Sequence, residues 1–122
     1  MIRKKILIVD DSSSIRELLK LTLSKENYEI LVGVDGRDAL KFLDGQHIDL
    51  VITDLHMPNM NGLELIREIR KLDYYKFVPI LFLTTETKSE IKQKAKMEGA
   101  TGWLTKPFDS EKLNRIVKKV LR

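Results

Sequence analysis

Three aspartates stand directly after short apolar runs of the sequence. Asp10 and Asp11 follow the run 6–9 (Ile-Leu-Ile-Val), and Asp54 follows the run 50–53 (Leu-Val-Ile-Thr). If the two runs are parallel strands of one sheet, the three carboxylates meet at the edge where the strands end. Carboxylates so close together repel one another at neutral pH unless a cation neutralises them. A few carboxylates completed by water molecules describe a Mg²⁺ site better than a Ca²⁺ cage.

The adjacent pair Asp10 and Asp11 also has a simpler explanation, because aspartate often caps the N-terminus of a helix. One of the two could have that role, but a third acid at a second strand end is less expected by chance. The same acids argue against a nucleotide or flavin site, since they would repel a phosphate where such sites place bare N–H groups. The sequence also contains no Gly-x-Gly-x-x-Gly and no P-loop motif.

A hydroxyl and an ammonium follow two further apolar runs. Thr84, with Thr85 after it, ends the run 79–84, and Lys106 follows the run 102–105. A carboxylate can attack phosphorus to form an acyl phosphate, and such a transfer depends on in-line placement and neutralisation of charge. Taken singly, Thr84 is better explained as an ordinary strand residue and Lys106 as a surface lysine. Their convergence with three carboxylates favours phosphoryl transfer to Asp54.

The elements that must position these residues are visible as an alternation of apolar runs and amphipathic segments. Nearly continuous aliphatic runs are typical of strands buried on both faces of a parallel sheet. The predicted strands cover residues 6–9, 29–32, 50–53, 79–84 and 102–105. The predicted helices carry apolar stripes at Ile15, Leu18, Leu19 and Thr22, at Ala39, Leu40 and Leu43, at Leu63, Ile66 and Ile69, and at Leu113, Ile116, Val117, Val120 and Leu121. This pattern predicts a doubly wound α/β fold with five strands, five helices, and helices on both faces of the sheet.

One predicted helix, residues 88–98, differs from the others. Its only apolar anchors are Ile91, Ala95 and Met97, which stand among many charges. A helix that buries so little should be less firmly docked. N-caps are predicted at one of the serines 12–14, at Asn61 and at Asp109.

Length and composition limit the classes of protein that fit. The 122 residues predict one domain spanning 1–122, with no second domain. The formal net charge is only +4, with the signs interleaved, which favours a solvated surface over a nucleic-acid interface. There is no cysteine, and no apolar run is long enough for a signal peptide or a membrane span. We expect a cytoplasmic protein without nucleic-acid binding or membrane insertion.

Four segments together resemble the receiver domain of two-component response regulators. They are residues 6–11, residues 54–62 (Asp-Leu-His-Met-Pro-Asn-Met-Asn-Gly), the Leu-Thr-Thr of residues 83–85, and Lys106-Pro107-Phe108. The resemblance covers essentially the whole chain, and the ordered set is far more specific than any one segment. It implies a flavodoxin-like sheet with strand order 2-1-3-4-5, an order that this family itself exemplifies.

The resemblance also implies a role for each residue of the site. Asp54 is the phosphoacceptor, and its phosphodonor is a phosphohistidine on a histidine kinase. Asp11, Asp54 and the backbone carbonyl of His56 bind Mg²⁺, while Asp10 acts through bound water. Thr84 donates to the phosphoryl group and Lys106 pairs with it. The domain catalyses only its own phosphorylation and dephosphorylation, so it is not expected to be an enzyme acting on other substrates.

A second group of residues is implied in the switch and its output: Trp103, Thr85, Glu86 and Pro107, the last joined to Lys106 by a cis bond in the family. Position 103 usually holds tyrosine or phenylalanine, which changes rotamer. Because indole is larger and its N–H needs a partner when buried, Trp103 either stays partly exposed as a partner contact or packs against the fourth helix. His56 and Glu86 occupy positions that tune the lifetime of the acyl phosphate in the family.

The chain resembles most the single-domain, CheY-type chemotaxis regulators, on the segment 99–108. This implies a monomer that binds a partner protein, the flagellar motor switch, once phosphorylated. A stand-alone receiver in another phosphorelay is the alternative. An aspartyl-phosphate hydrolase of small molecules is less expected, because His56 replaces its second aspartate. A scaffold that works without phosphorylation is also less expected, because the site is complete.

Overall fold

Five parallel strands form the sheet that the apolar runs predict. The computed structural model describes residues 3–122. The strands are β1 (Lys5–Val9), β2 (Glu29–Gly33), β3 (Leu50–Thr53), β4 (Ile80–Thr84) and β5 (Gly102–Thr105). Their order is β2-β1-β3-β4-β5, which confirms the doubly wound, flavodoxin-like fold.

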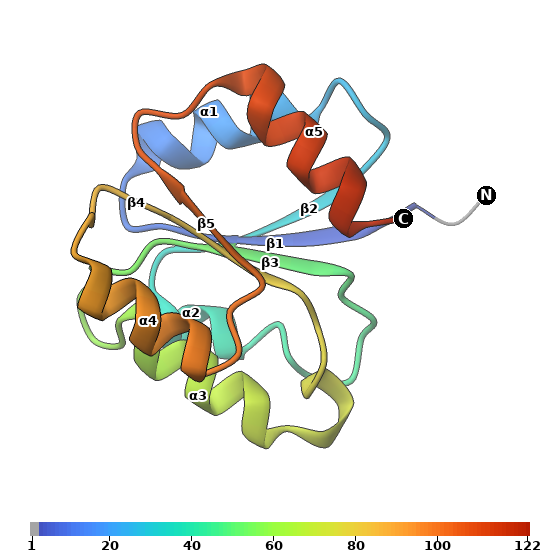
Figure 1. The fold of residues 1–122 in the computed structure, drawn as a ribbon. Helices are drawn as coiled ribbons and strands as arrows, with labels where there is room; N and C mark the ends of the chain where they lie inside the picture. Colours follow the sequence, from blue (N-terminus) through green and yellow to red (C-terminus); the bar gives the residue numbers. More distant parts are fainter. Residues whose placement is uncertain (1–2) are drawn as a thin grey trace.

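Helices cover both faces of this sheet. They are α1 (Ser13–Leu23), α2 (Gly36–Leu40), α3 (Gly62–Lys71), α4 (Ser89–Met97) and α5 (Ser110–Val120). Figure 1 shows α1 and α5 on one face and α2, α3 and α4 on the other. A short 3₁₀ helix, η1 (Asp73–Tyr75), was not predicted, and Leu43 lies beyond the end of α2. Among the described residues, no helix combines the length and apolarity that a membrane crossing requires.

The core consists of two layers because successive strand residues point to opposite faces. Leu7 and Val9 of β1 pack with Phe82 of β4 and with α3 in one layer. Ile6 and Ile8 pack with α1 and α5 in the other. Both layers are buried, which explains why the strands read as continuous aliphatic runs.

The strand register brings the predicted site residues to one edge. Val9 pairs with Thr53, and Thr84 pairs with Thr105. The amide of Asp54 donates to the carbonyl of Val9 at 2.9 Å, and the amide of Lys106 donates to the carbonyl of Thr84 at 2.9 Å. The residues that follow β1, β3, β4 and β5 therefore lie side by side.

Helix α4 is held mainly at its C-terminal end. Ala95 is buried, Ile91 is half-buried, and Lys88 at the N-terminus makes no side-chain cap. Met97 was expected to be an anchor, but it is 86% exposed, so that prediction was wrong. The C-terminal end is fixed instead by polar contacts, because the Arg70 guanidinium of α3 donates to the carbonyl of Gly99 at 2.7 Å.

Three helices begin at the predicted kinds of cap. Ser12 caps α1 by accepting from the amide of Ile15. Asn61 and Glu64 form a reciprocal capping box at α3, and Asp109 caps α5. Because Ser12 caps α1, that helix begins directly after Asp10 and Asp11. Because Asn61 caps α3, the loop that follows Asp54 ends there.

Candidate functional site

A cluster of three carboxylates lies where β1 and β3 end. Asp10, Asp11 and Asp54 each offer an oxygen, and these oxygens all lie within 4.8 Å of one another. Asp10 and Asp54 are buried, whereas Asp11 is exposed. The cluster is thus anchored in the protein on one side and open to solvent on the other.

The ammonium of Lys106 joins two of these carboxylates. Its Nζ donates to Asp10 Oδ2 and to Asp54 Oδ2, both at 2.8 Å. Burial by itself lowers the pKa of Lys106, but the hydrogen bonds to the two carboxylates outweigh burial, so the pKa is raised above its usual value. Lys106, which follows β5, is therefore a charged counterion for the carboxylates at the ends of β1 and β3.

Asp10 is held from three directions. Its Oδ1 accepts from the amide of Ser12 at 2.9 Å, and its Oδ2 accepts from Lys106. Burial is the largest influence and raises the pKa of Asp10 despite these bonds. The backbone carbonyl of Asp10 accepts from Arg16 Nη1 at 2.7 Å, a contact that the sequence did not suggest. Asp10 therefore stabilises the loop between β1 and α1 and is also a member of the cluster.

Asp54 is held by hydrogen bonds to both of its carboxylate oxygens. Its Oδ1 accepts from the amide of Leu55 at 2.6 Å, while Oδ2 faces Lys106. Gly62 lies directly behind it, where a Cβ would collide with the Asp54 carbonyl oxygen and come within 2.6 Å of the Phe82 ring. Only glycine lets α3 approach this closely, so Gly62 helps to position Asp54.

Thr84 is fully buried at the end of β4, and its Oγ1 accepts from the amide of Glu86 at 3.3 Å. Thr85 is exposed. The bond from Lys106 to Pro107 is cis, as the resemblance implies. The hydroxyl of Thr84 thus lies between the Asp54 strand and the Lys106 strand.

A polar bridge forms one rim of the site. His56 Nε2 lies 3.0 Å from Glu86 Oε1, joining the loop after β3 to the loop after β4. Backbone N–H donation from Lys88, followed by the His56 contact, lowers the pKa of Glu86. The His56 ring is therefore engaged with Glu86 at the rim of the site.

Trp103 combines features of the two arrangements considered for it. Its ring is half-buried against the core and stacks on Phe82 at 5.4 Å. The Lys92 ammonium of α4 lies 5.9 Å from the ring centroid. Its Nε1 is buried without a hydrogen-bond partner among the described residues. Trp103 therefore packs under α4 with an unsatisfied donor.

One supporting contact was missed entirely at the sequence level. Asp35, the N-cap of α2, accepts from Asn59 Nδ2 at 2.7 Å. Asn59 has a φ of 67°, in the left-handed region that asparagine tolerates. An asparagine after a Met-Pro pair could have signalled a turn, but nothing in the sequence identified its partner. The contact holds the loop that follows Asp54.

The cluster fits a hard divalent cation. All of its donors are carboxylate oxygens, two are buried, and one side is open, which suits a Mg²⁺ that keeps several waters. A single ammonium does not balance three carboxylates, so a further cation would stabilise the site.

The sequence and the structure both match known receivers. The family model for the response regulator receiver domain matches residues 6–118. The regulator PhoP of alkaline phosphatase synthesis in Bacillus subtilis is 35% identical over 98% of this chain and 49% of its own length. The response regulator ArlR of Staphylococcus aureus is 36% identical over 97% of this chain and 52% of its own. The chain thus spans about half the length of these two relatives.

Solved structures give the same assignment. The chemotaxis protein CheY4 of Vibrio cholerae has a TM-score of 0.93 and 46% identity, covering 98% of this chain and all of that one. A receiver protein from Pseudomonas putida has a TM-score of 0.89 and 32% identity, with 98% of both chains covered. With the acidic cluster, the lysine and the sheet order in place, this chain belongs to the family of response regulator receiver domains of two-component signalling.

Proposed function

We propose that this chain is a phosphorylation switch in which Asp54 accepts a phosphoryl group from the phosphohistidine of a histidine kinase. The observation that carries the proposal is the 2.8 Å contact between Lys106 Nζ and Asp54 Oδ2 beside two further carboxylates. This arrangement orients Asp54 beside exposed Asp11, on the side of the cluster where a donor would approach.

The chain's own residues then have separate parts in the transfer. The amide of Leu55 fixes Asp54 Oδ1, which leaves Oδ2 oriented as the nucleophile. Lys106 is in place to pair with a phosphoryl oxygen, and the Thr84 hydroxyl can donate to another. When bound at Asp10, Asp11, Asp54 and the His56 carbonyl, Mg²⁺ would neutralise phosphoryl charge and offset the repulsion among the carboxylates. No other substrate is turned over.

The added phosphoryl group carries roughly −1.5 to −2 charges. Because Lys106 and Thr84 belong to the ends of β5 and β4, new bonds to them would displace the loop that leads to α4. Helix α4 has no side-chain cap at this end, so the bonds can shift it with little loss of contact. Trp103, Thr85, Glu86 and Pro107 lie along this route and are the proposed output residues.

The partner is proposed to be a protein of the chemotaxis pathway, the flagellar motor switch, bound by a cytoplasmic monomer. Support comes from the similarity to CheY4, which this chain covers over its full length. Against this stands the similarity to transcriptional regulators such as PhoP, so a stand-alone receiver in another phosphorelay is the alternative.

Phosphorylation with acetyl phosphate and Mg²⁺, followed by mass mapping, tests this proposal. We expect one added phosphoryl group on Asp54, none after chelation of Mg²⁺, and none in Asp54→Asn. The matched control is Asp44→Asn, which changes an exposed aspartate outside the cluster and should label normally. Full labelling of Asp54→Asn would show that another residue is the acceptor. Steady hydrolysis of an added phosphate monoester would instead indicate a phosphatase.

A further inference from the structure

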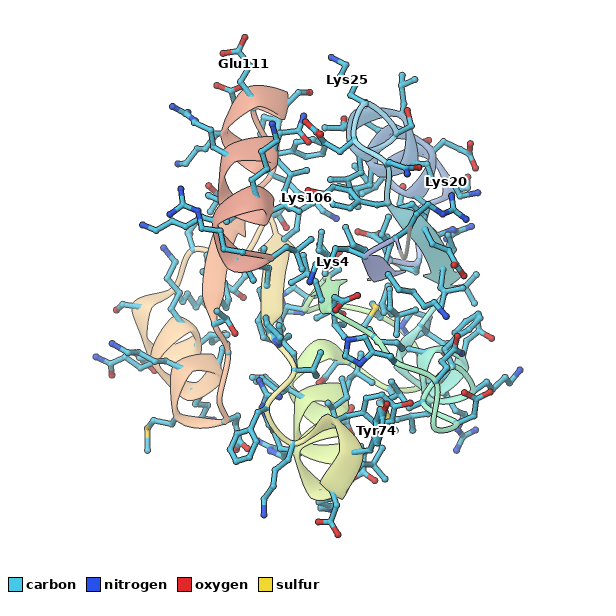
Figure 2. All side chains as sticks on the ribbon, turned by 90° about the vertical axis from the view of Figure 1, so that its right-hand side faces the viewer. Lys4, Lys20, Lys25, Tyr74, Lys106 and Glu111 are labelled. Carbon is cyan, nitrogen blue, oxygen red and sulfur yellow. The ribbon has the colours of Figure 1, made fainter. Side chains whose placement is uncertain are left out.

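A second concave surface lies at the opposite end of the sheet, where the strands begin. Two segments border a hollow of about 290 Å³ there, one before β3 and one around η1. Its principal lining residues are His47, Asp49, Asp73, Tyr74, Phe77 and Pro79. Tyr74 is labelled in Figure 2, whose view faces this end of the molecule. The phosphoacceptor site lies at the other end of the strands, so this surface is not part of it.

The aromatic side chains of this surface are unusually exposed. Phe77 is 89% exposed and Tyr74 is 62% exposed. Isolated exposed apolar residues are common, but two aromatic rings bordering one hollow are typical of a contact site.

The surface is also rigid. Tyr75, next to Tyr74, is buried, and its hydroxyl donates to the carbonyl of Gln46 at 2.7 Å and accepts from the amide of Gly45 at 2.9 Å. These bonds join the two bordering segments. The Tyr74 ring packs edge-on against Tyr75 with centroids 5.0 Å apart. Arg70 fixes the far side by donating to the carbonyl of Val78 at 2.7 Å. A rigid aromatic surface loses little entropy when it binds.

The charges of the hollow select the kind of occupant. Two aspartates line this hollow and none of the 22 Lys and Arg residues does, although exposed Lys76 lies in the segment that borders it. Among residues 3–122, Asp73 has neither an ion pair nor a side-chain hydrogen bond. Asp49 already accepts from His47 at 2.7 Å and from the amide of Lys5 at 2.8 Å, with Lys4 Nζ at 4.0 Å. Asp73 is therefore the carboxylate that remains available.

We propose that this surface, formed by the residues that line the hollow, docks an arginine-bearing segment of a partner protein. A guanidinium is planar and weakly hydrated, so it stacks on aromatic rings and pairs with a carboxylate at the same time. Tyr74 and Phe77 supply the rings and Asp73 supplies the carboxylate. The interaction would leave the phosphoacceptor end of the domain free.

The test titrates the isotope-labelled, Mg²⁺-loaded protein with the peptide acetyl-Leu-Arg-Leu-amide and follows amide shifts by NMR. The control peptide carries citrulline, which has nearly the shape of arginine but no charge. We expect saturable shifts at the amides of residues 47–49 and 73–78, and binding about tenfold weaker for citrulline.

Variants locate the binding. Phe77→Ala and Asp73→Asn should each weaken binding about tenfold, because each removes one principal contact. Leu21→Ala, which truncates a 67% exposed apolar residue on α1, should leave binding unchanged. All three should accept a phosphoryl group normally, so the result is independent of the proposed function.

Three outcomes would overturn the proposal: equal binding of both peptides, shifts confined to the surroundings of Asp10 and Asp54, or no saturable shift. A concentration-dependent dimer that shifts the same amides without peptide would assign the surface to a second copy of the chain instead.

Discussion

The ammonium of Lys106 should be the main source of stability of the acidic cluster, and Lys106→Met tests this directly. Methionine keeps most of the length and volume of the side chain but removes its charge. At an effective dielectric constant of about 20, two unit charges 2.8 Å apart attract by about 6 kcal/mol, much of which desolvation offsets. Removing one partner of a buried pair costs about 3–5 kcal/mol, because the remaining charge is left unpaired.

We expect a loss near the lower limit, about 3 kcal/mol, because the cluster is open to water on the side of exposed Asp11. For a chain of 122 residues this lowers the unfolding midpoint by about 12 °C. Calorimetry at pH 7 in a chelating buffer measures it. Lys118→Met is the matched control, since Lys118 contacts Glu26 at the same 2.8 Å but is 60% exposed, and its midpoint should not move.

Acid and Mg²⁺ should both rescue Lys106→Met. Because burial raises the pKa of Asp10, the folded protein holds more protons than the unfolded chain between the usual pKa of 3.8 and the raised one. Stability therefore falls as pH rises through that window, and it should fall further without Lys106. Mg²⁺ at a hundred times its Kd adds about 2.7 kcal/mol to any protein that binds it only when folded. At one fixed Mg²⁺ concentration the effect should be larger in the variant, which binds Mg²⁺ more tightly because no ammonium competes for the carboxylates. An unchanged midpoint, or equal rescue of both proteins, would refute this account.

Three further outcomes are expected. Asn61→Ala removes the α3 capping box and should lower the free energy of unfolding in urea by about 1 kcal/mol, whereas Ser110→Ala, inside α5, should have little effect. Gly62→Ala should destabilise by about 1–3 kcal/mol and slow phosphorylation, because its Cβ would meet the Asp54 carbonyl; a normal rate would show that the backbone of Asp54 need not be held there. Trp103 fluorescence should change on phosphorylation, since its ring contacts Phe82 and lies near Lys92; an unchanged spectrum, matching that of Asp54→Asn, would argue against movement of β5 and α4.

The strands and the grouping of the site residues were predictable because both depend on local patterns. A strand buried on both faces has to be a continuous aliphatic run, and the structure places all five strands within one residue of the predicted limits at either end. Once parallel strands are assumed, residues after their ends must lie together. The convergence of Asp10, Asp54, Thr84 and Lys106 follows from that rule alone.

Contacts between segments far apart in the sequence were not predictable in this way. Met97 stands only two residues after Ala95, so the helix turns it away from the core, and the end of α4 is held instead by Arg70 of α3. The link from Asp35 to Asn59 and the support of Asp10 by Arg16 depend on how loops fold against each other. The spacing of apolar residues in the sequence does not indicate contacts of this kind.

The sequence by itself determined the fold class, the order of the elements and the set of groups around Asp54, because strand burial and strand-end position leave a direct pattern in residue type. Only the tertiary structure decided that Lys106 lies between Asp10 and Asp54, that the buried N–H of Trp103 has no partner within residues 3–122, and that two exposed aromatic rings border a hollow with an available carboxylate. These features depend on side-chain distances across the sheet. Distances of that kind are set by the packing of the whole domain and not by any single segment.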